Sequence, residues 1–216
     1  METKMKMKTE TRAFNFEIRA EENEQHGHFL TGRPIVYNQV TNLGWYDEII
    51  APGALNATDL KDVRFLIGHD TSMVPLARSR NNNENSTMQM VVDESGMGIR
   101  VDLDIENNDD SRKLYSATKR GDISGMSFAF VVDGDAWDDI DSDHPKRTIR
   151  SIKRVFEVSA VAFPAYEGTS LEARSEDAAP DGARDSLESA RAALREAREN
   201  ERRAEALARL DKWRKA

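Results

Sequence analysis

Three side chains of the kinds used in acyl-transfer chemistry lie in or beside apolar segments of the sequence. Ser127 lies in a run of aromatic and aliphatic residues, His69 follows the mainly apolar segment 63–67, and Glu157 interrupts the apolar stretch 153–163. An imidazole can take the proton of a hydroxyl, and a carboxylate can fix the tautomer of that imidazole. Together the three types could form a nucleophile, a general base and an orienting acid.

Each of the three residues also has an ordinary explanation. Ser127 can be a small polar residue on a half-exposed strand, and His69 can be a loop imidazole in solvent. If its strand alternates, Glu157 shares an inward face with Val155, and a buried carboxylate requires a cation or several donors; otherwise it faces solvent. Ser124 is a second candidate nucleophile. The residue types alone leave these alternatives open.

Composition excludes several other kinds of chemistry. The chain of 216 residues contains no cysteine, which rules out thiol nucleophiles, thiolate metal sites and disulfides. Its four histidines are scattered and form no His-Glu-X-X-His motif, so we expect no metal and no cofactor. A net charge of −8 argues against nucleic-acid binding. The first residues are too polar for a signal peptide and no apolar run reaches the ~20 residues of a membrane span, so we expect an intracellular protein without a membrane partner.

Short strands dominate the elements that must position these side chains. Alternating and apolar segments recur between residues 13 and 166, and 126–132 is the predicted strand that carries Ser127. One helix is predicted over 107–119, with acids in its first turn and Gly121 as its stop. Many strands with one helix predict an α+β domain built as a barrel or a sandwich.

Composition also divides the chain into four parts. We expect a disordered leader at 1–12, a strand-rich domain at 13–170, a linker at 171–184 and a charged helical tail at 185–216. The apolar stripe of the tail is thin, and such a stripe rarely packs against its own domain. A partner helix, in a scaffold protein or a coiled coil, or disorder is therefore the expected state of the tail.

Four segments of the chain, taken together, resemble the prohead maturation proteases of tailed bacteriophages. These proteases are similar in fold to assemblin, the assembly protease of herpesviruses. The resemblance covers residues 13–170 and rests on four motifs in family order, which read EIIAPGAL (48–55), FLIGHD (65–70), KRGDISGMSFAF (119–130) and FEVSAVAFPAY (156–166).

The resemblance implies a role for each candidate residue. His69 corresponds to the general base and Ser127 to the nucleophile; Ser127 is preferred to Ser124 because the herpesvirus enzymes have a similar Gly-apolar-Ser-apolar arrangement. The herpesvirus enzymes use a second histidine on the later strand, and here Glu157 stands in that place. Their arginine pair at the oxyanion site is absent. Backbone N–H groups of residues 165 or 166 could replace it, and that assignment stays open.

The resemblance also implies a fold and a function. The fold is a mostly antiparallel β-barrel wrapped by helices. The function is that of a serine endopeptidase that cleaves scaffold, or the scaffolding segment of the major capsid protein, inside the immature capsid in the host cytoplasm. It would also cleave itself within 175–184, and it could be a homo-oligomer, as its herpesvirus relatives are dimers. The alternative is a non-catalytic scaffold or assembly protein of the same fold, which would have no reason to bury Glu157.

Overall fold

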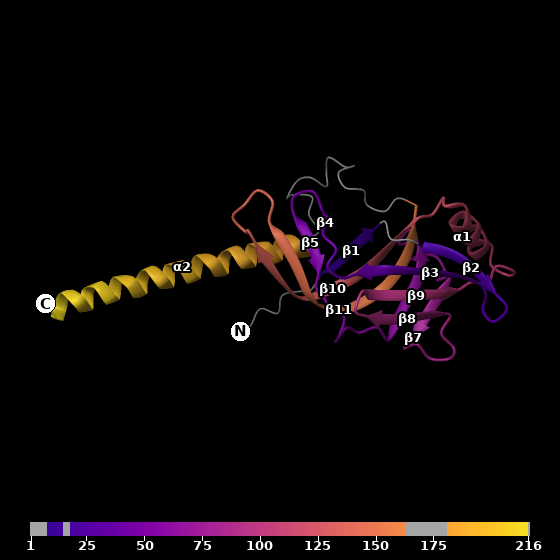
Figure 1. Cartoon of the computed structure of the whole chain (residues 1–216), viewed down its shortest axis with the longest axis horizontal. Helices are drawn as coiled ribbons and strands as arrows, with labels where there is room; N and C mark the ends of the chain where they lie inside the picture. Colours follow the sequence, from indigo (N-terminus) through magenta and orange to yellow (C-terminus); the bar gives the residue numbers. More distant parts are fainter. Residues whose placement is uncertain (1–7, 15–17, 163–180, 216) are drawn as a thin grey trace.

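The computed structural model describes residues 8–14, 18–162 and 181–215, which form two β-sheets and two helices (Figure 1). The larger sheet contains β1 (Thr9–Phe14), β4 (Thr41–Asn42), β5 (Asp47–Ile50), β6 (Asp62–Ile67), β7 (Ala77–Arg80), β10 (Gly125–Asp138) and β11 (Lys146–Val161). The smaller sheet contains β2 (Ile18–Asn23), β3 (Gly27–Val36), β8 (Met88–Asp93) and β9 (Gly96–Asp102).

The larger sheet is built around the antiparallel pair of β10 and β11. β1 pairs antiparallel with the other edge of β10. The two ends of β11 have different partners, because β5 runs parallel to its first residues and β6 runs parallel to its last residues. The smaller sheet is antiparallel throughout, in the order β2-β3-β9-β8. This arrangement places the ends of β6, β10 and β11 beside one another.

The α+β class predicted from the sequence is confirmed, but the prediction of a barrel wrapped by helices is wrong. Among the described residues the two sheets stay open, with β1, β4 and β7 as ends of the larger sheet and β2 and β8 as edges of the smaller one. α1 (Asp109–Arg120) packs along the strands, whereas α2 (Asp181–Lys215) contacts β10 and β1 at its base and then projects away from the body (Figure 1). Alternation predicts how many strands form, but closure depends on whether edge strands pair, which alternation does not encode.

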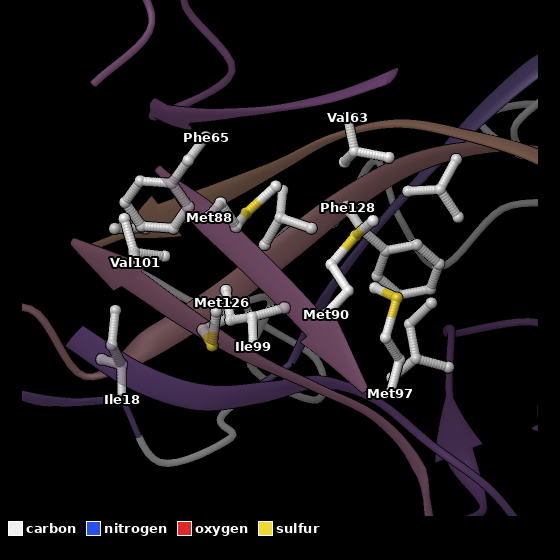
Figure 2. Packing of buried hydrophobic residues seen from close by; sticks show 14 of the residues in the cluster. Ile18, Val63, Phe65, Met88, Met90, Met97, Ile99, Val101, Met126 and Phe128 are labelled. Carbon is white, nitrogen blue, oxygen red and sulfur yellow. The ribbon is translucent and has the colours of Figure 1, made fainter. Parts of the chain in front are cut away.

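A single large core lies between the sheets and draws side chains from both. Figure 2 shows Met126 and Phe128 of β10 pointing into this core, close to methionines contributed by β8 and β9. Both residues are completely buried. Because side chains alternate along a strand, the residue between them, Ser127, faces the other side of the sheet.

The predicted helix at 107–119 is confirmed as α1, and its capping groups explain its limits. The side chain of Asn108 accepts hydrogen bonds from the N–H groups of Asp110 and Ser111 at 3.0 and 3.1 Å. At the other end Gly121 has a φ of 83°, and its N–H caps the last carbonyls. The helix packs on β2 and β3, and its end leads directly into β10.

A buried cluster of charges fixes β1 to the larger sheet. Arg12 donates to Glu10 and Glu48 at 2.6 Å, and Arg147 donates to the same two carboxylates and to Asp135 at 2.6–3.1 Å. Burial acts to raise the pKa of Glu10, but the hydrogen bond and charge of Arg147 and the charge of Arg12 outweigh it and lower this pKa. Residues 9–12 therefore belong to a strand, and the predicted disordered leader is wrong for this part of 1–12.

Replacing Arg147 with methionine should lower the free energy of unfolding by about 3–5 kcal/mol, because Glu10 and Glu48 would then share Arg12 alone and Asp135 would lose its cation. Urea unfolding of the full chain measures the change. Arg78→Met is the matched control, since the ion pair of Arg78 with Asp62 is partly exposed and should contribute much less to stability. Equal losses in the two variants would contradict a special role for the cluster.

The tail, which the sequence predicts as a charged helix over 185–216, lies within the helix α2. α2 begins at Asp181, so the last four residues of the predicted linker 171–184 are helical, while 171–180 lie outside the described residues. At its base Ala183 and Leu187 are fully buried in a small second core with aromatic residues of the loop before β5. The first turns of the tail thus pack on their own domain.

The rest of α2 is exposed. Leu207 and Leu210 are each 58% exposed and Trp213 is 81% exposed, which agrees with a thin stripe that its own domain does not cover. No helix among the described residues combines the length and the apolar character that crossing a membrane would require.

Candidate active site

The candidate site lies on the outer face of the larger sheet, where β10, β11 and β6 are neighbours. Ser127 of β10 is directly opposite Ser159 of β11, which in turn is opposite Leu66 of β6. Residues that are directly opposite share a face of a sheet. Glu157 is two residues before Ser159 and therefore lies on this face as well.

A β-bulge at Phe156 decides which way Glu157 points. Along β10 the consecutive residues Ala129 and Phe130 pair with Glu157 and Val155, so that one residue of β11 is skipped. Val155 belongs to the core between the sheets, whereas Glu157 faces the opposite side. The predicted face shared by Glu157 and Val155 is therefore wrong, because the bulge interrupts the alternation on which that prediction depended.

A tight turn after β6 brings His69 over this face. Gly68 and His69 have φ angles of 59° and 62°, and the N–H of Asp70 donates to the carbonyl of Ile67 at 3.1 Å. These are the features of a type I′ turn, in which both central residues are left-handed. Glycine adopts this backbone without cost, but histidine does so only where neighbouring contacts hold it.

The side chains of His69 and Glu157 meet across 88 residues of sequence. Nδ1 of His69 lies 2.6 Å from Oε1 of Glu157, and the glutamate is only 5% exposed. An ionised carboxylate accepts hydrogen bonds, so this contact places the proton of the imidazole on Nδ1 and leaves Nε2 as the basic nitrogen. This is the arrangement that an orienting acid and a general base require.

Ser127 lies on the same face, but its hydroxyl has another partner. The side chain is fully buried, and Oγ donates to the backbone carbonyl of Arg12 on β1 at 2.7 Å. A hydroxyl has one proton, so it is not shared with the imidazole in this arrangement. The structure therefore joins two of the three predicted residues directly and places the third nearby, on the neighbouring strand.

Ser124 differs from Ser127 in exposure and in position. It precedes β10 and is exposed, just before Gly125, which pairs with Val161. The N–H of Gly68 donates to the carbonyl of Ala160 at 3.0 Å, so the turn that carries His69 lies at this same end of the sheet. Both serines thus lie toward the end of the larger sheet at which the turn holds the imidazole of His69.

The other acidic and basic groups near the site are engaged elsewhere. The carboxylate of Asp70 accepts the hydroxyl and the N–H of Ser72, and these hydrogen bonds lower the pKa of Asp70. Asp70 therefore does not replace Glu157 as the partner of Nδ1. The other three histidines contact Arg100, Glu22 and Asp47. Residues 165 and 166, the expected oxyanion donors, lie outside the described residues.

The described residues hold no group of three or more histidine and acidic side chains placed to bind a metal ion. A cleft of about 450 Å³ lies between β10 and the base of α2, and its lining includes Asp135, Arg147 and Ser186. None of the three candidate residues lines it. The candidate site is therefore separate from this cleft.

Sequence reasoning missed two contributors to the site. Alternation along the strand places Ser159 on one face with Glu157, but the sequence indicates no role for it at the site. The structure makes it a partner of both His69 and Glu157. The backbone of Arg12 was placed in the leader, and nothing in its local sequence indicates that its carbonyl would accept the hydroxyl of Ser127.

An imidazole held by a buried carboxylate, beside a strand that carries a serine, is typical of hydrolases with a serine nucleophile. Residues 14–181 match the sequence profile described as caudovirus prohead serine protease, and the chain belongs to this family. The prediction of a bacteriophage protease family of capsid maturation is therefore confirmed. No curated protein matches the chain.

Among solved structures, the capsid assembly protease of bacteriophage T4, gp21, is similar to the chain at 14% sequence identity and a TM-score of 0.39. The match covers 72% of this chain and 99% of that one.

Proposed function

We propose that this protein is the serine endopeptidase of capsid maturation, with Ser127 as the nucleophile, His69 as the general base and Glu157 as the acid that orients it. The observation that carries the proposal is the 2.6 Å contact between Nδ1 of His69 and Oε1 of Glu157. Membership of the prohead serine protease family supports the reaction type.

The reaction follows from this geometry. Nε2 of His69 takes the proton of the serine hydroxyl as Oγ attacks the carbonyl carbon of the scissile peptide bond. The imidazolium then gives that proton to the leaving amine, and water hydrolyses the acyl-enzyme by the same route. The negative carboxylate of Glu157 stabilises the imidazolium in both steps. The hydroxyl of Ser127 must first release the carbonyl of Arg12.

The substrate in this proposal is the scaffold, or the scaffolding segment of the major capsid protein, cleaved inside the immature capsid in the host cytoplasm. The exposed end of α2 supports a helical partner, because its apolar side chains have no cover from their own domain. Removal of the tail by self-cleavage within 175–184 is part of the same proposal. A protein that acted only as scaffold would keep the fold and the tail but would cleave neither the capsid protein nor itself.

The nucleophile can be identified with a fluorophosphonate probe, which reacts with activated serines without any knowledge of the cleavage sequence. Oγ forms a bond to phosphorus, fluoride leaves, and the hydroxyl proton passes to the imidazole. We expect one equivalent of label on the purified full chain, located by peptide mapping at Ser127. Label at Ser124 would move the nucleophile to that residue. A chain without label, together with uncleaved capsid protein on co-expression, would favour the scaffold alternative.

A further inference from the structure

Ser159 contacts both members of the histidine–glutamate pair. It is fully buried, its Oγ donates to Oε2 of Glu157 at 2.6 Å, and the same oxygen accepts the backbone N–H of His69 at 3.1 Å. One hydroxyl therefore spans the two groups whose relative placement sets the direction of the imidazole.

The hydrogen bond between Ser159 and the N–H of His69 restrains a backbone conformation that is unfavourable for a residue other than glycine. His69 has a φ of 62°, in the left-handed region that favours glycine, and it follows a second left-handed residue, Gly68. A non-glycine residue keeps this conformation only where its surroundings hold it. Within the described residues, the partner of the His69 N–H is Ser159, so this hydroxyl holds the residue in the turn.

The bond to Glu157 acts on the other side of the pair. Oε1 of the carboxylate contacts the imidazole and Oε2 accepts the hydroxyl of Ser159, so each oxygen has its own partner. Two contacts fix the plane of the carboxylate, whereas one would let it rotate about its side chain. Without the hydroxyl of Ser159, Oε2 of Glu157 would be a buried acceptor with no donor, which costs free energy. The carboxylate would then favour a different orientation from the one observed.

The nucleophile does not compete for this hydroxyl. Ser127 is directly across from Ser159 on the neighbouring strand, but it donates in the opposite direction, to Arg12 of β1. Ser159 in turn donates its single hydroxyl proton in a hydrogen bond to Glu157. The two serines thus have separate roles on one face of the sheet.

We infer that Ser159 is a positioning residue for the reaction, which holds the backbone of His69 and the carboxylate of Glu157 so that the imidazole stays directed at the nucleophile. The inference rests on the proposed function of this site. It assigns no contact between Ser159 and the substrate.

Ser159→Ala tests the inference in the full chain. The rate of fluorophosphonate labelling at the nucleophile should fall about 10- to 100-fold, by analogy with the loss measured for residues that orient the ligands of catalytic metal ions. Ser159→Thr keeps the hydroxyl and should recover most of the rate. Equal rates in the alanine and threonine variants, or an alanine variant as fast as the unchanged chain, would overturn the assignment.

Ser86→Ala is the matched control. Ser86 is also buried, and its Oγ likewise accepts a backbone N–H, from Arg80 at 2.8 Å, and donates to a side-chain oxygen, Oδ1 of Asn83 at 3.1 Å. Removing it costs the same two kinds of hydrogen bond away from the site. We expect thermal unfolding to shift similarly in both alanine variants, while only Ser159→Ala slows labelling. A comparable loss of labelling in Ser86→Ala would reduce Ser159 to a structural residue.

A second measurement does not depend on activity. In chains with ¹⁵N-labelled histidine, the Nδ1–H signal of His69, identified by its loss in His69→Ala, should shift in Ser159→Ala and stay in place in Ser86→Ala. An unchanged signal in Ser159→Ala would overturn the inference. Absence of fluorophosphonate label in the unchanged chain would instead overturn the proposed function. The Nδ1–H signal of His69 would still decide whether Ser159 holds His69 and Glu157 in place.

Discussion

Ser127→Ala should abolish fluorophosphonate labelling and leave the co-expressed major capsid protein uncleaved, while the chain still folds. The expected loss is large because residues of such a set act as a unit, and removing the nucleophile of a comparable enzyme costs about 10⁶-fold in rate. The free energy of unfolding should change little, since the variant loses one hydrogen bond, to the carbonyl of Arg12. Such a bond typically contributes about 1 kcal/mol.

Ser124→Ala provides the control for this experiment. It removes a hydroxyl three residues away, from an exposed position that precedes the strand. We expect this variant to be labelled and to process the capsid protein at the rate of the unchanged chain. Cleavage that survives in Ser127→Ala and disappears in Ser124→Ala would assign the nucleophile to Ser124 and leave Ser127 as a structural link between β10 and β1.

Glu157→Gln should slow the reaction by about 10⁴-fold without unfolding the chain. The amide that replaces the carboxylate can donate to Nδ1, which favours the wrong tautomer, and it no longer balances the charge of the imidazolium; the corresponding change in a serine protease triad has this magnitude. The labelling rate across pH measures the effect, and the side-chain volume stays the same.

A suitable control for the glutamate is Glu48→Gln, which alters another buried carboxylate of the same sheet. Glu48 accepts from Arg12 and Arg147, so its loss should lower the free energy of unfolding and leave the labelling rate of the folded protein unchanged. A Glu157→Gln variant that reacts as fast as the unchanged chain would show that Nδ1 needs no carboxylate.

Features that depend on neighbours in sequence were predictable from the sequence alone. The helix predicted over 107–119 and its end at Gly121 follow from local backbone preferences, and the structure has both as expected. The candidate residues His69, Ser127 and Glu157 were also found from sequence, because polar groups in apolar segments are costly without a purpose. Resemblance to the family, and not periodicity, selected them from the alternatives.

Features that depend on contacts between distant segments were decided only by the tertiary structure. The bulge at Phe156 turned Glu157 away from the core, and the pairing of β6 with β11 brought His69 to it. The pairing of β1 with β10 set the partner of the Ser127 hydroxyl. Alternation along a strand predicts which residues share a face, but bulges and strand neighbours are set by packing energy summed over the whole molecule. The sequence alone therefore identified the candidate residues, and the tertiary structure determined how they face one another.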